Sequence, residues 1–311
     1  MGGELASLVA TMLEREPWVG ELMGLDVDPP RRRLRRAVFH RVDPLASDRI
    51  AALVTAFAPH VVLHLGVYEP GARAGNQEAG RWTSSMLAGV MDGARTRSLE
   101  HIVVRSGVTI YGTAARGGAH PHEYTPIEPN THFGHMLAEV EARAWDTGGA
   151  AHVPVGAVRL APVIGPHVPS PLGRLLRLPI VPFPLFGRSE FAVVSDHDAA
   201  TALVAAVHRH LEGPVNVAAA GSISPLDAIR RGRRLPVPLV GPQWSVAVGV
   251  TRLAGAPVPE HILELLHHGR HADVSAMSER LGVRPTLTTP EVIDRLYSWP
   301  SVVRRVITEA A

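Results

Sequence analysis

Apolar residues recur along the chain with two different periods, and the two patterns alternate. Residues 5–13 and 47–58 carry apolar side chains at helical spacing, which predicts amphipathic helices. Short apolar runs at 60–67, 102–112 and 153–165 have the length and the β-branched content of buried strands. Helices that alternate with such strands indicate an α/β protein with a parallel sheet.

The run at 102–112 is the clearest of the predicted strands, and it ends in polar residues and glycine. In an open α/β sheet, ligands bind beyond the carboxyl ends of the strands. We therefore expect a ligand site where this run ends.

Composition limits the class of protein. The chain has 311 residues, of which 46% are hydrophobic, enough for one large core and a smaller lobe. We find no apolar run near the ~18 residues of a membrane span, and no basic start followed by an apolar core as in a signal peptide. These patterns predict a cytoplasmic protein without a membrane partner. Cysteine is absent from the sequence, so disulfides and thiolate metal sites are excluded.

Arginine supplies every strongly basic side chain, because the sequence contains no lysine. No reaction that needs a lysine amine is therefore available to the chain. The arginine cluster at 31–36 has no interleaved aromatic residues and no groove-reading motif, so we expect a solvated turn and no nucleic-acid partner. His267, His268 and His271 have no acid at ligand spacing, and we expect no metal site.

Four segments together resemble one family. The 102–112 run resembles the SSxxxYG strand of the extended short-chain dehydrogenase/reductases, the NAD-dependent epimerases and dehydratases of nucleotide sugars. The glycine-rich start at 2–6 resembles part of the GxxGxxG fingerprint, 153–166 resembles the LRxxxVYGP strand, and 273–291 resembles the closing motif. The chain is thus similar to an atypical member of this family over nearly its full length.

The resemblance implies an α/β fold with a Rossmann-type, doubly wound parallel sheet and a smaller C-terminal substrate lobe. The Rossmann domain is expected at 1–165 and the lobe at 166–311, with 188–217 returning to the sheet. By analogy with the family, a homodimer would form through helices near 82–95 and 131–146.

The start of the chain lacks the first glycine of the fingerprint and the strand that precedes it. We expect a gap between the strands at 22–26 and 61–65, where a central strand would lie. Our hypothesis is that the natural product begins upstream of Met1, and that the chain as given binds dinucleotide poorly.

The cofactor implied by the resemblance is NAD. Asp26, with Asp28 in reserve, has the spacing of the acid that binds the adenosine ribose, although an ordinary turn acid before two prolines explains either residue as well. A carboxylate there repels a 2′-phosphate, while nearby Arg31 and Arg32 keep NADP open. The other implied cofactor positions are Gly2, Gly3, Ala6, Val42, Asp43, Leu65, Gly66 and Ala161. His64, next to these positions, is expected to be a hydrogen-bonded core histidine and not a ligand.

All three catalytic positions of the family are changed. Gly107 stands where the serine is expected, Phe133 where the tyrosine is, and Leu137 where the lysine is. Phenylalanine has no proton to exchange and leucine has no charge, so the usual alcohol oxidation should be lost or very slow. Substitutes for the lost groups are available nearby, namely Ser106, Thr109, Tyr111, His132 and His135.

Three functions remain open at this point. The first is an NAD(P)-binding protein of the nucleotide-sugar epimerase/dehydratase type, with weak or altered chemistry on a nucleoside-diphosphate sugar. The second is a non-catalytic module that senses a dinucleotide or binds another protein. The third is a decayed gene product without a cofactor.

Overall fold

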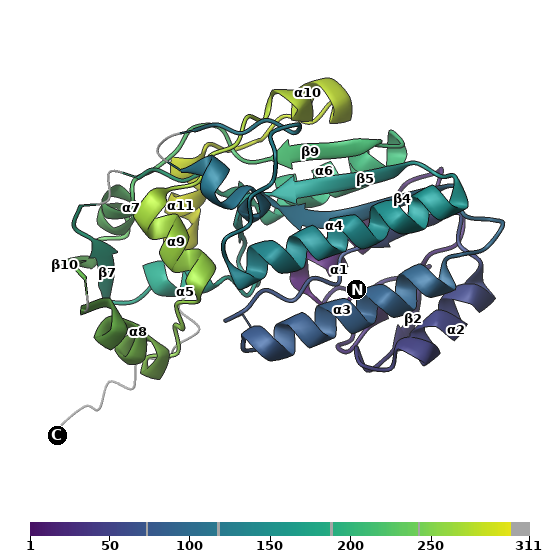
Figure 1. Ribbon diagram of the computed structural model, residues 1–311, viewed down its shortest axis with the longest axis horizontal. Coiled ribbons are helices and arrows are strands. Elements are labelled where there is room, and N and C mark those ends of the chain that lie inside the picture. The colour runs from purple at the N-terminus through teal and green to yellow at the C-terminus, as the bar shows by residue number, and fades with distance from the viewer. Residues whose placement is uncertain (73, 117–118, 187–188, 242, 300–311) are drawn as a thin grey trace.

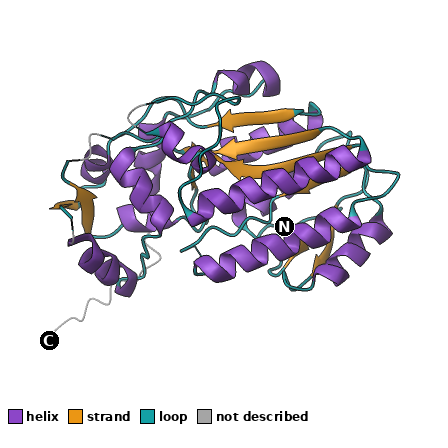
Figure 2. Cartoon of the chain, viewed as in Figure 1, coloured by secondary structure: helices purple, strands orange, loops and turns teal. Residues whose placement is uncertain are grey.

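The computed structural model describes residues 1–72, 74–116, 119–186, 189–241 and 243–299. A parallel sheet lies at the centre of the larger half (Figures 1 and 2), with strands in the order β3 (Val61–His64), β4 (His101–Gly107), β5 (Val155–Leu160) and β9 (Gly213–Val217). The last of these strands comes long after residue 165, so the chain does return to the sheet.

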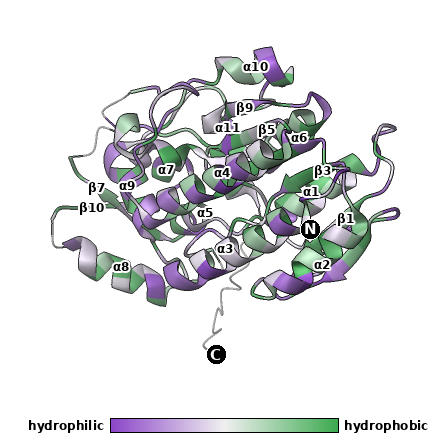
Figure 3. Ribbon diagram, turned by 45° about the vertical axis from the view of Figure 1, so that its right-hand side comes forward, coloured by the Kyte–Doolittle hydropathy of each residue, from purple (hydrophilic) through white to green (hydrophobic). Residues whose placement is uncertain are grey.

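Helices cover both faces of this sheet. On one face lie α3 (Asn76–Gly93) and α4 (His132–Ala151), and on the other lie α1 (Glu4–Leu13) and α6 (Asp196–His208). Hydrophilic and hydrophobic residues alternate along the covering helices, as Figure 3 shows for α3 and α4. The sheet therefore has a hydrophobic core on each side, as a doubly wound fold requires.

Strand β4 shows how the sequence divides between the two cores. Ile102 and Val104 pack with the α3 and α4 side, whereas Val103 packs with the α1 and α6 side. This division follows from the two-residue period of a strand, whose successive side chains point to opposite faces. All three side chains are completely buried.

The predicted strand at 102–112 is too long. Strand β4 ends at Gly107, and a 3-10 helix, η1 (Val108–Ala115), follows it. The partner strand decides this end, because Gly107 pairs with Leu160, the last residue of β5. Gly112 then turns the chain at φ 47°, where a Cβ atom would lie 1.9 Å from the carbonyl oxygen of Glu128.

The parallel sheet is in two pieces. β1 (Met23–Asp26) pairs with β2 (Val38–Arg41), and within the described residues neither strand pairs with β3. The side chain of Met1 packs over Gly24 of β1, where an added Cβ atom would lie 2.1 Å from the methionine sulfur. The interruption lies where the sequence predicts a gap.

The smaller lobe has its own hydrophobic core. It contains two short parallel pairs, β6 (Val163–Ile164) with β8 (Val194–Ser195), and β7 (Ile180–Pro184) with β10 (Leu235–Leu239).

The remaining helices of the two halves are α2 (Ser47–Phe57), α5 (Pro171–Leu176), α7 (Pro225–Arg231), α8 (Gln243–Leu253), α9 (Glu260–His268), α10 (Ser275–Leu281) and α11 (Thr289–Ser298). None of the helices in the described part of the chain has the length and apolar character needed to span a bilayer.

Candidate active site

A cavity of about 110 Å³ lies between the start of α1, the end of β1 and the loop that follows β3. Five predicted cofactor residues line it together: Gly3, Ala6, Asp26, Leu65 and Gly66. The fold thus gathers residues from three separate segments of the sequence around one cavity.

The N-terminus of α1 faces this cavity. Gly3 is the N-cap of the helix, and no side chain caps the first turn. The first N–H groups of a helix have no partner within the helix, so an uncapped N-terminus can bind an anion such as a diphosphate. A Cβ atom added to Gly3 would meet no atom within 4 Å, which shows that this residue borders open space.

The Asp26 carboxylate is held by the backbone around it. It accepts hydrogen bonds from the N–H groups of Gly2 at 2.6 Å and Val27 at 2.8 Å, and from the Met1 ammonium group at 3.0 Å. Burial raises the pKa of this carboxyl, but the ammonium charge and the backbone donors outweigh burial and lower it. Gly2 thus orients Asp26 and is not among the residues that line the cavity, so its contact with the cofactor stays a prediction.

Two other predicted cofactor residues lie apart from this cavity. Val42 and Asp43, which follow β2, line a second hollow with Arg41 and Trp82. Ala161 lines neither cavity, and its contact with the cofactor stays a prediction. It is buried after β5, where its N–H donates to the carbonyl of Val217, and only Val163 of the following strand reaches the first cavity.

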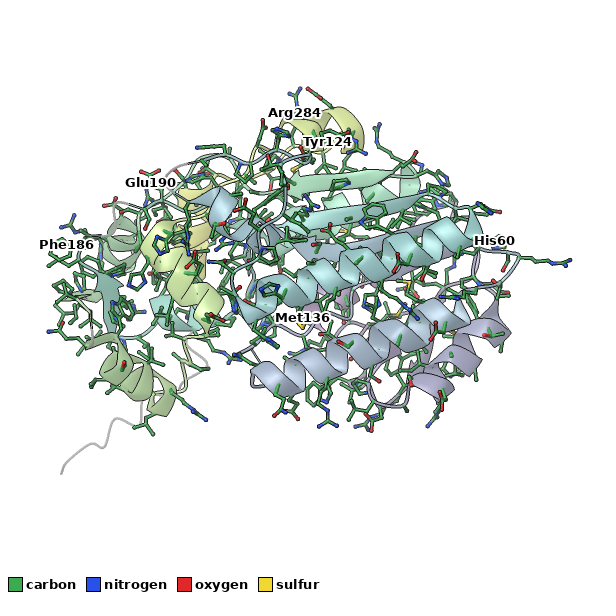
Figure 4. All side chains as sticks on the ribbon, viewed as in Figure 1. His60, Tyr124, Met136, Phe186, Glu190 and Arg284 are labelled. Carbon is green, nitrogen blue, oxygen red and sulfur yellow. The ribbon has the colours of Figure 1, made fainter. Side chains whose placement is uncertain are left out.

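The three positions that the resemblance assigns to the catalytic serine, tyrosine and lysine lie together. A Cβ atom on Gly107 would lie 3.2 Å from Cδ1 of Leu137, and Leu137 is 1% exposed. Phe133 lies one helical turn before Leu137 on α4 and is also buried. Met136, labelled in Figure 4, marks this part of α4. The corner where β4 ends is therefore apolar and closely packed.

The predicted substitute hydroxyls are not available at this corner. Tyr111 is fully buried, donates to Asn216 at 2.8 Å and accepts from Arg159 at 2.9 Å. Ser106 is 2% exposed, and its hydroxyl has no partner within the described residues. Both side chains belong to the core: Ser106 lies in β4, which is covered on both faces, and Tyr111 lies in η1 with its hydroxyl bonded on two sides. Their roles as catalytic substitutes stay predictions.

Thr109 lies in η1 and is also buried. Its carbonyl accepts a hydrogen bond at 3.1 Å from Arg270, a buried arginine of the substrate lobe. Burial lowers the pKa of Arg270 to about 10, so the side chain stays charged at neutral pH. Thr109 therefore joins the two halves of the protein through its backbone.

The family model described as "NAD dependent epimerase/dehydratase family" matches residues 3–218. The chain belongs to this family. The match covers the strands and helices of the central sheet, including the cavity and the changed catalytic corner.

Solved structures share the fold over nearly the whole chain. A UDP-glucose 4-epimerase from Thermotoga maritima, solved with UDP-glucose, superposes with a TM-score of 0.73 at 13% identity and covers 96% of each chain. A UDP-galactose 4-epimerase gives a TM-score of 0.71 at 19% identity and covers 95% of each chain. A UDP-glucuronic acid 4-epimerase from Bacillus cereus, solved with NAD, gives 0.68 at 17% identity and covers 96% of this chain and 94% of its own.

Curated relatives are similar at the level of sequence. Uncharacterized proteins of Mycobacterium tuberculosis and Mycobacterium bovis are each 27% identical over 316 residues, covering 94% of this chain and 80% of theirs. The similarity therefore extends into the substrate lobe, beyond the segment that the family model matches.

Three charged or titratable residues near the site lie outside the family motifs. Glu69 and Arg105 line the first cavity, and His261 of α9 bonds to Glu69. Burial lowers the pKa of Arg105, and the charge of Glu69 opposes this effect. Arg105 could have been predicted as a site residue, because an arginine is unusual inside an apolar strand. No feature of the neighbouring sequence indicates Glu69 or His261.

Proposed function

We propose that this protein binds NAD and acts on a nucleoside-diphosphate sugar, in a site where the usual serine, tyrosine and lysine are replaced. The observation that carries the proposal is the first cavity, which five predicted cofactor positions line in common. The structural neighbours include a UDP-glucose 4-epimerase solved with UDP-glucose and a UDP-glucuronic acid 4-epimerase solved with NAD.

The residues present fit a dinucleotide. The uncapped start of α1 suits the diphosphate, and Asp26 suits the adenosine ribose. A side chain on Gly66 would be crowded, because a Cβ atom there would lie 3.1 Å from Met86 and 3.2 Å from His64. When it is bound, the dinucleotide supplies hydride transfer.

The charges around the predicted ribose site favour NAD over NADP. Arg32 is paired with Glu4 at 2.7 Å, so its charge is already compensated. The Asp26 carboxylate faces the same cavity and would repel a 2′-phosphate.

Gly107 and Leu137 are complementary in size. A Cβ atom on Gly107 would lie 3.2 Å from Cδ1 of Leu137, so a side chain there would crowd the leucine. The site therefore has neither hydroxyl nor charge at these two positions, and Phe133 has no proton to exchange. A purely non-catalytic role for the same fold is the alternative, and a turnover assay separates it from an enzyme.

Cofactor binding is tested with a matched pair of glycine variants. Gly3 and Gly75 are both N-caps at φ −71°, and a Cβ atom added to either would meet nothing within 4 Å. Gly3→Val places a branched side chain at the cavity, so we expect calorimetry to show NAD binding weakened by about 100-fold. Gly75→Val should bind like the wild type. Equal affinity in all three proteins, or no NAD binding by the wild type, would contradict the proposal.

Turnover is tested with NAD and four sugars: UDP-glucose, UDP-galactose, UDP-glucuronic acid and dTDP-glucose. The proposal expects slow conversion of at least one of them. The variant Phe133→Tyr/Leu137→Lys restores two family residues, and we expect it to increase that rate. Binding of NAD without conversion of any sugar would favour the sensing or protein-binding module.

A further inference from the structure

A buried histidine and a carboxylate meet where the substrate lobe contacts the Rossmann half. Nε2 of His261 lies 3.0 Å from Oε1 of Glu69. The side chains are only 5% and 19% exposed. His261 belongs to the first turn of α9, whereas Glu69 belongs to the loop after β3. The pair therefore links segments that carry the two ligand-binding parts of the fold.

This pair lies beside the changed catalytic corner. The ring of His261 packs against that of Phe133, with centroids 4.7 Å apart and planes at 43°. Figure 1 shows α9 next to the start of α4, the helix that carries Phe133. An imidazole thus lies directly next to the position where the family has its tyrosine.

Glu69 connects His261 to the cavity. Its side chain lines the cavity together with Gly66 and Arg105. Among the described residues that line this space, Arg105 is the one basic side chain, and its charge interacts with that of Glu69. The positions Gly107, Phe133 and Leu137 are apolar, but His261 packs on Phe133 and is hydrogen-bonded to Glu69, which lines the cavity with Arg105.

The hydrogen bond also orients the imidazole. An ionised carboxylate only accepts hydrogen bonds, so Nε2 is the donor to Glu69. Within the described residues, no hydrogen bond is made by Nδ1 of His261. In the neutral imidazole this arrangement leaves the lone pair on Nδ1, as a general base requires.

We propose that His261, oriented by Glu69, is the proton acceptor of this site and replaces the missing tyrosine in the oxidation of a sugar hydroxyl. The inference rests on the proposed function. The O–H bond of the hydroxyl breaks and its proton goes to Nδ1 of His261. The C–H bond on the same carbon breaks as well, its hydride goes to the nicotinamide of the bound dinucleotide, and the carbon–oxygen bond becomes a carbonyl.

Other contacts already hold the loop of Glu69 against the lobe. Arg174 of α5 donates to the carbonyls of Gly71 at 3.2 Å and Ala72 at 2.6 Å. Pro259 packs against Gly71, at 3.1 Å from a Cβ atom placed there. Loss of the Glu69 bond should therefore leave the loop in place.

The same helix offers a matched control. His268 lies 3.8 Å from Glu264 in a second histidine–carboxylate pair, but its side chain is 44% exposed. His261→Gln keeps an amide donor near Glu69 and removes the proton acceptor. We expect it to lower kcat at least about 100-fold with KM and the affinity for NAD unchanged. His268→Gln should leave kcat within about twofold.

Two further variants separate a catalytic role from a structural one. His261→Ala should be inactive and should regain turnover when imidazole is added, since a free base can enter the space. Glu69→Gln should lower kcat at least about tenfold without a change in KM. Undiminished kcat in His261→Gln, or no rescue of His261→Ala by imidazole, would overturn the inference.

A spectroscopic readout does not depend on turnover. In the protein labelled with ¹⁵N at its histidine rings and saturated with NAD, the His261 signals are those that His261→Gln lacks. We expect at least one of the four sugars to shift these signals and to leave those of His268 in place. If NAD binds but no sugar shifts them, the inference is wrong while the cofactor part of the proposed function stands. If NAD does not bind, the proposed function itself fails.

Discussion

Two pairs, Arg159 with Glu141 and His261 with Glu69, each join a basic side chain to a carboxylate, and they differ in what surrounds them. Arg159 of β5 and Glu141 of α4 form two hydrogen bonds, at 2.9 and 2.7 Å. Arg159 also donates to Tyr111 and to the carbonyl of Glu123. In contrast, Glu69 and His261 share one bond at the wall of a cavity.

The difference distinguishes a buried pair that stabilises the fold from a pair that can take part in proton transfer. Burial lowers the pKa of Arg159, but the bonds and the charge of Glu141 outweigh it, and the pKa is raised. A group with its donors in use and its proton held this firmly has nothing to exchange. In the pair of Glu69 and His261, Glu69 lines the cavity and His261 uses one of its two ring nitrogens, so this pair retains a group that can accept a proton.

The largest expected effect comes from breaking the first pair. Arg159→Met leaves the Glu141 carboxylate buried without its partner, and we expect the free energy of unfolding to fall by about 3–5 kcal/mol in urea titrations. The double variant Arg159→Met/Glu141→Leu removes both charges and should recover much of this loss. A single variant as stable as the wild type would show that the pair is not what holds this corner.

His64 tests what a buried imidazole does without an acceptor. It is 3% exposed, and its Nε2 has no partner within the described residues, so the hydrogen-bonded histidine predicted from the sequence lacks a bond at this atom. Burial lowers its pKa to about 4, helped by the charge of the Met1 ammonium.

As the pH falls, His64 is therefore protonated in the unfolded state before it is protonated in the folded state. As the pH falls below about 6.5, the fold should lose stability progressively, by about 3 kcal/mol at pH 4 from this group. His64→Leu removes the effect, so the variant should gain on the wild type between pH 6.5 and pH 4 and not above pH 7. Urea titrations at several pH values measure this, and parallel stability curves for the two proteins would contradict it.

Tyr111→Phe should have a smaller effect. It leaves Arg159 and Asn216 each without one buried partner, and we expect a loss of about 1–3 kcal/mol in the free energy of unfolding. Turnover of any sugar that the wild type converts should persist, because Tyr111 lies away from the cavity. Loss of activity without loss of stability would return Tyr111 to the catalytic site.

The smallest expected change in stability is that of Glu69→Gln. The side chain is 19% exposed and glutamine still accepts the bond from His261, so the free energy of unfolding, measured by thermal denaturation, should change by less than about 1 kcal/mol. Together with the lowered kcat expected above, this result would place Glu69 in the chemistry. A loss as large as that of Arg159→Met would instead make the two pairs structurally equivalent.

An exposed ion pair provides a reference for these changes in the free energy of unfolding. Arg143 and Asp92 lie 2.6 Å apart between α4 and α3, but both side chains are largely exposed. Solvent screens such a pair, and Arg143→Ala should cost no more than about 1 kcal/mol in the same urea titrations.

The sequence by itself determined the family, the alternation of helices and strands, and five residues that line the first cavity together. Local pattern sufficed for these, because helical spacing and strand length are properties of a short window. It placed a helix at 47–58, and the structure has α2 at Ser47–Phe57. It also located the changed positions Gly107, Phe133 and Leu137, which meet at one corner.

Tertiary structure decided what a short window cannot contain. β4 ends at Gly107 because its partner β5 ends at Leu160, not because its own residues change character. Tyr111 is in the core because Arg159 and Asn216 reach its hydroxyl from elsewhere in the chain. Glu69 and His261 are 192 residues apart, and only the docking of the lobe on the sheet brings a carboxylate and an imidazole within one hydrogen bond.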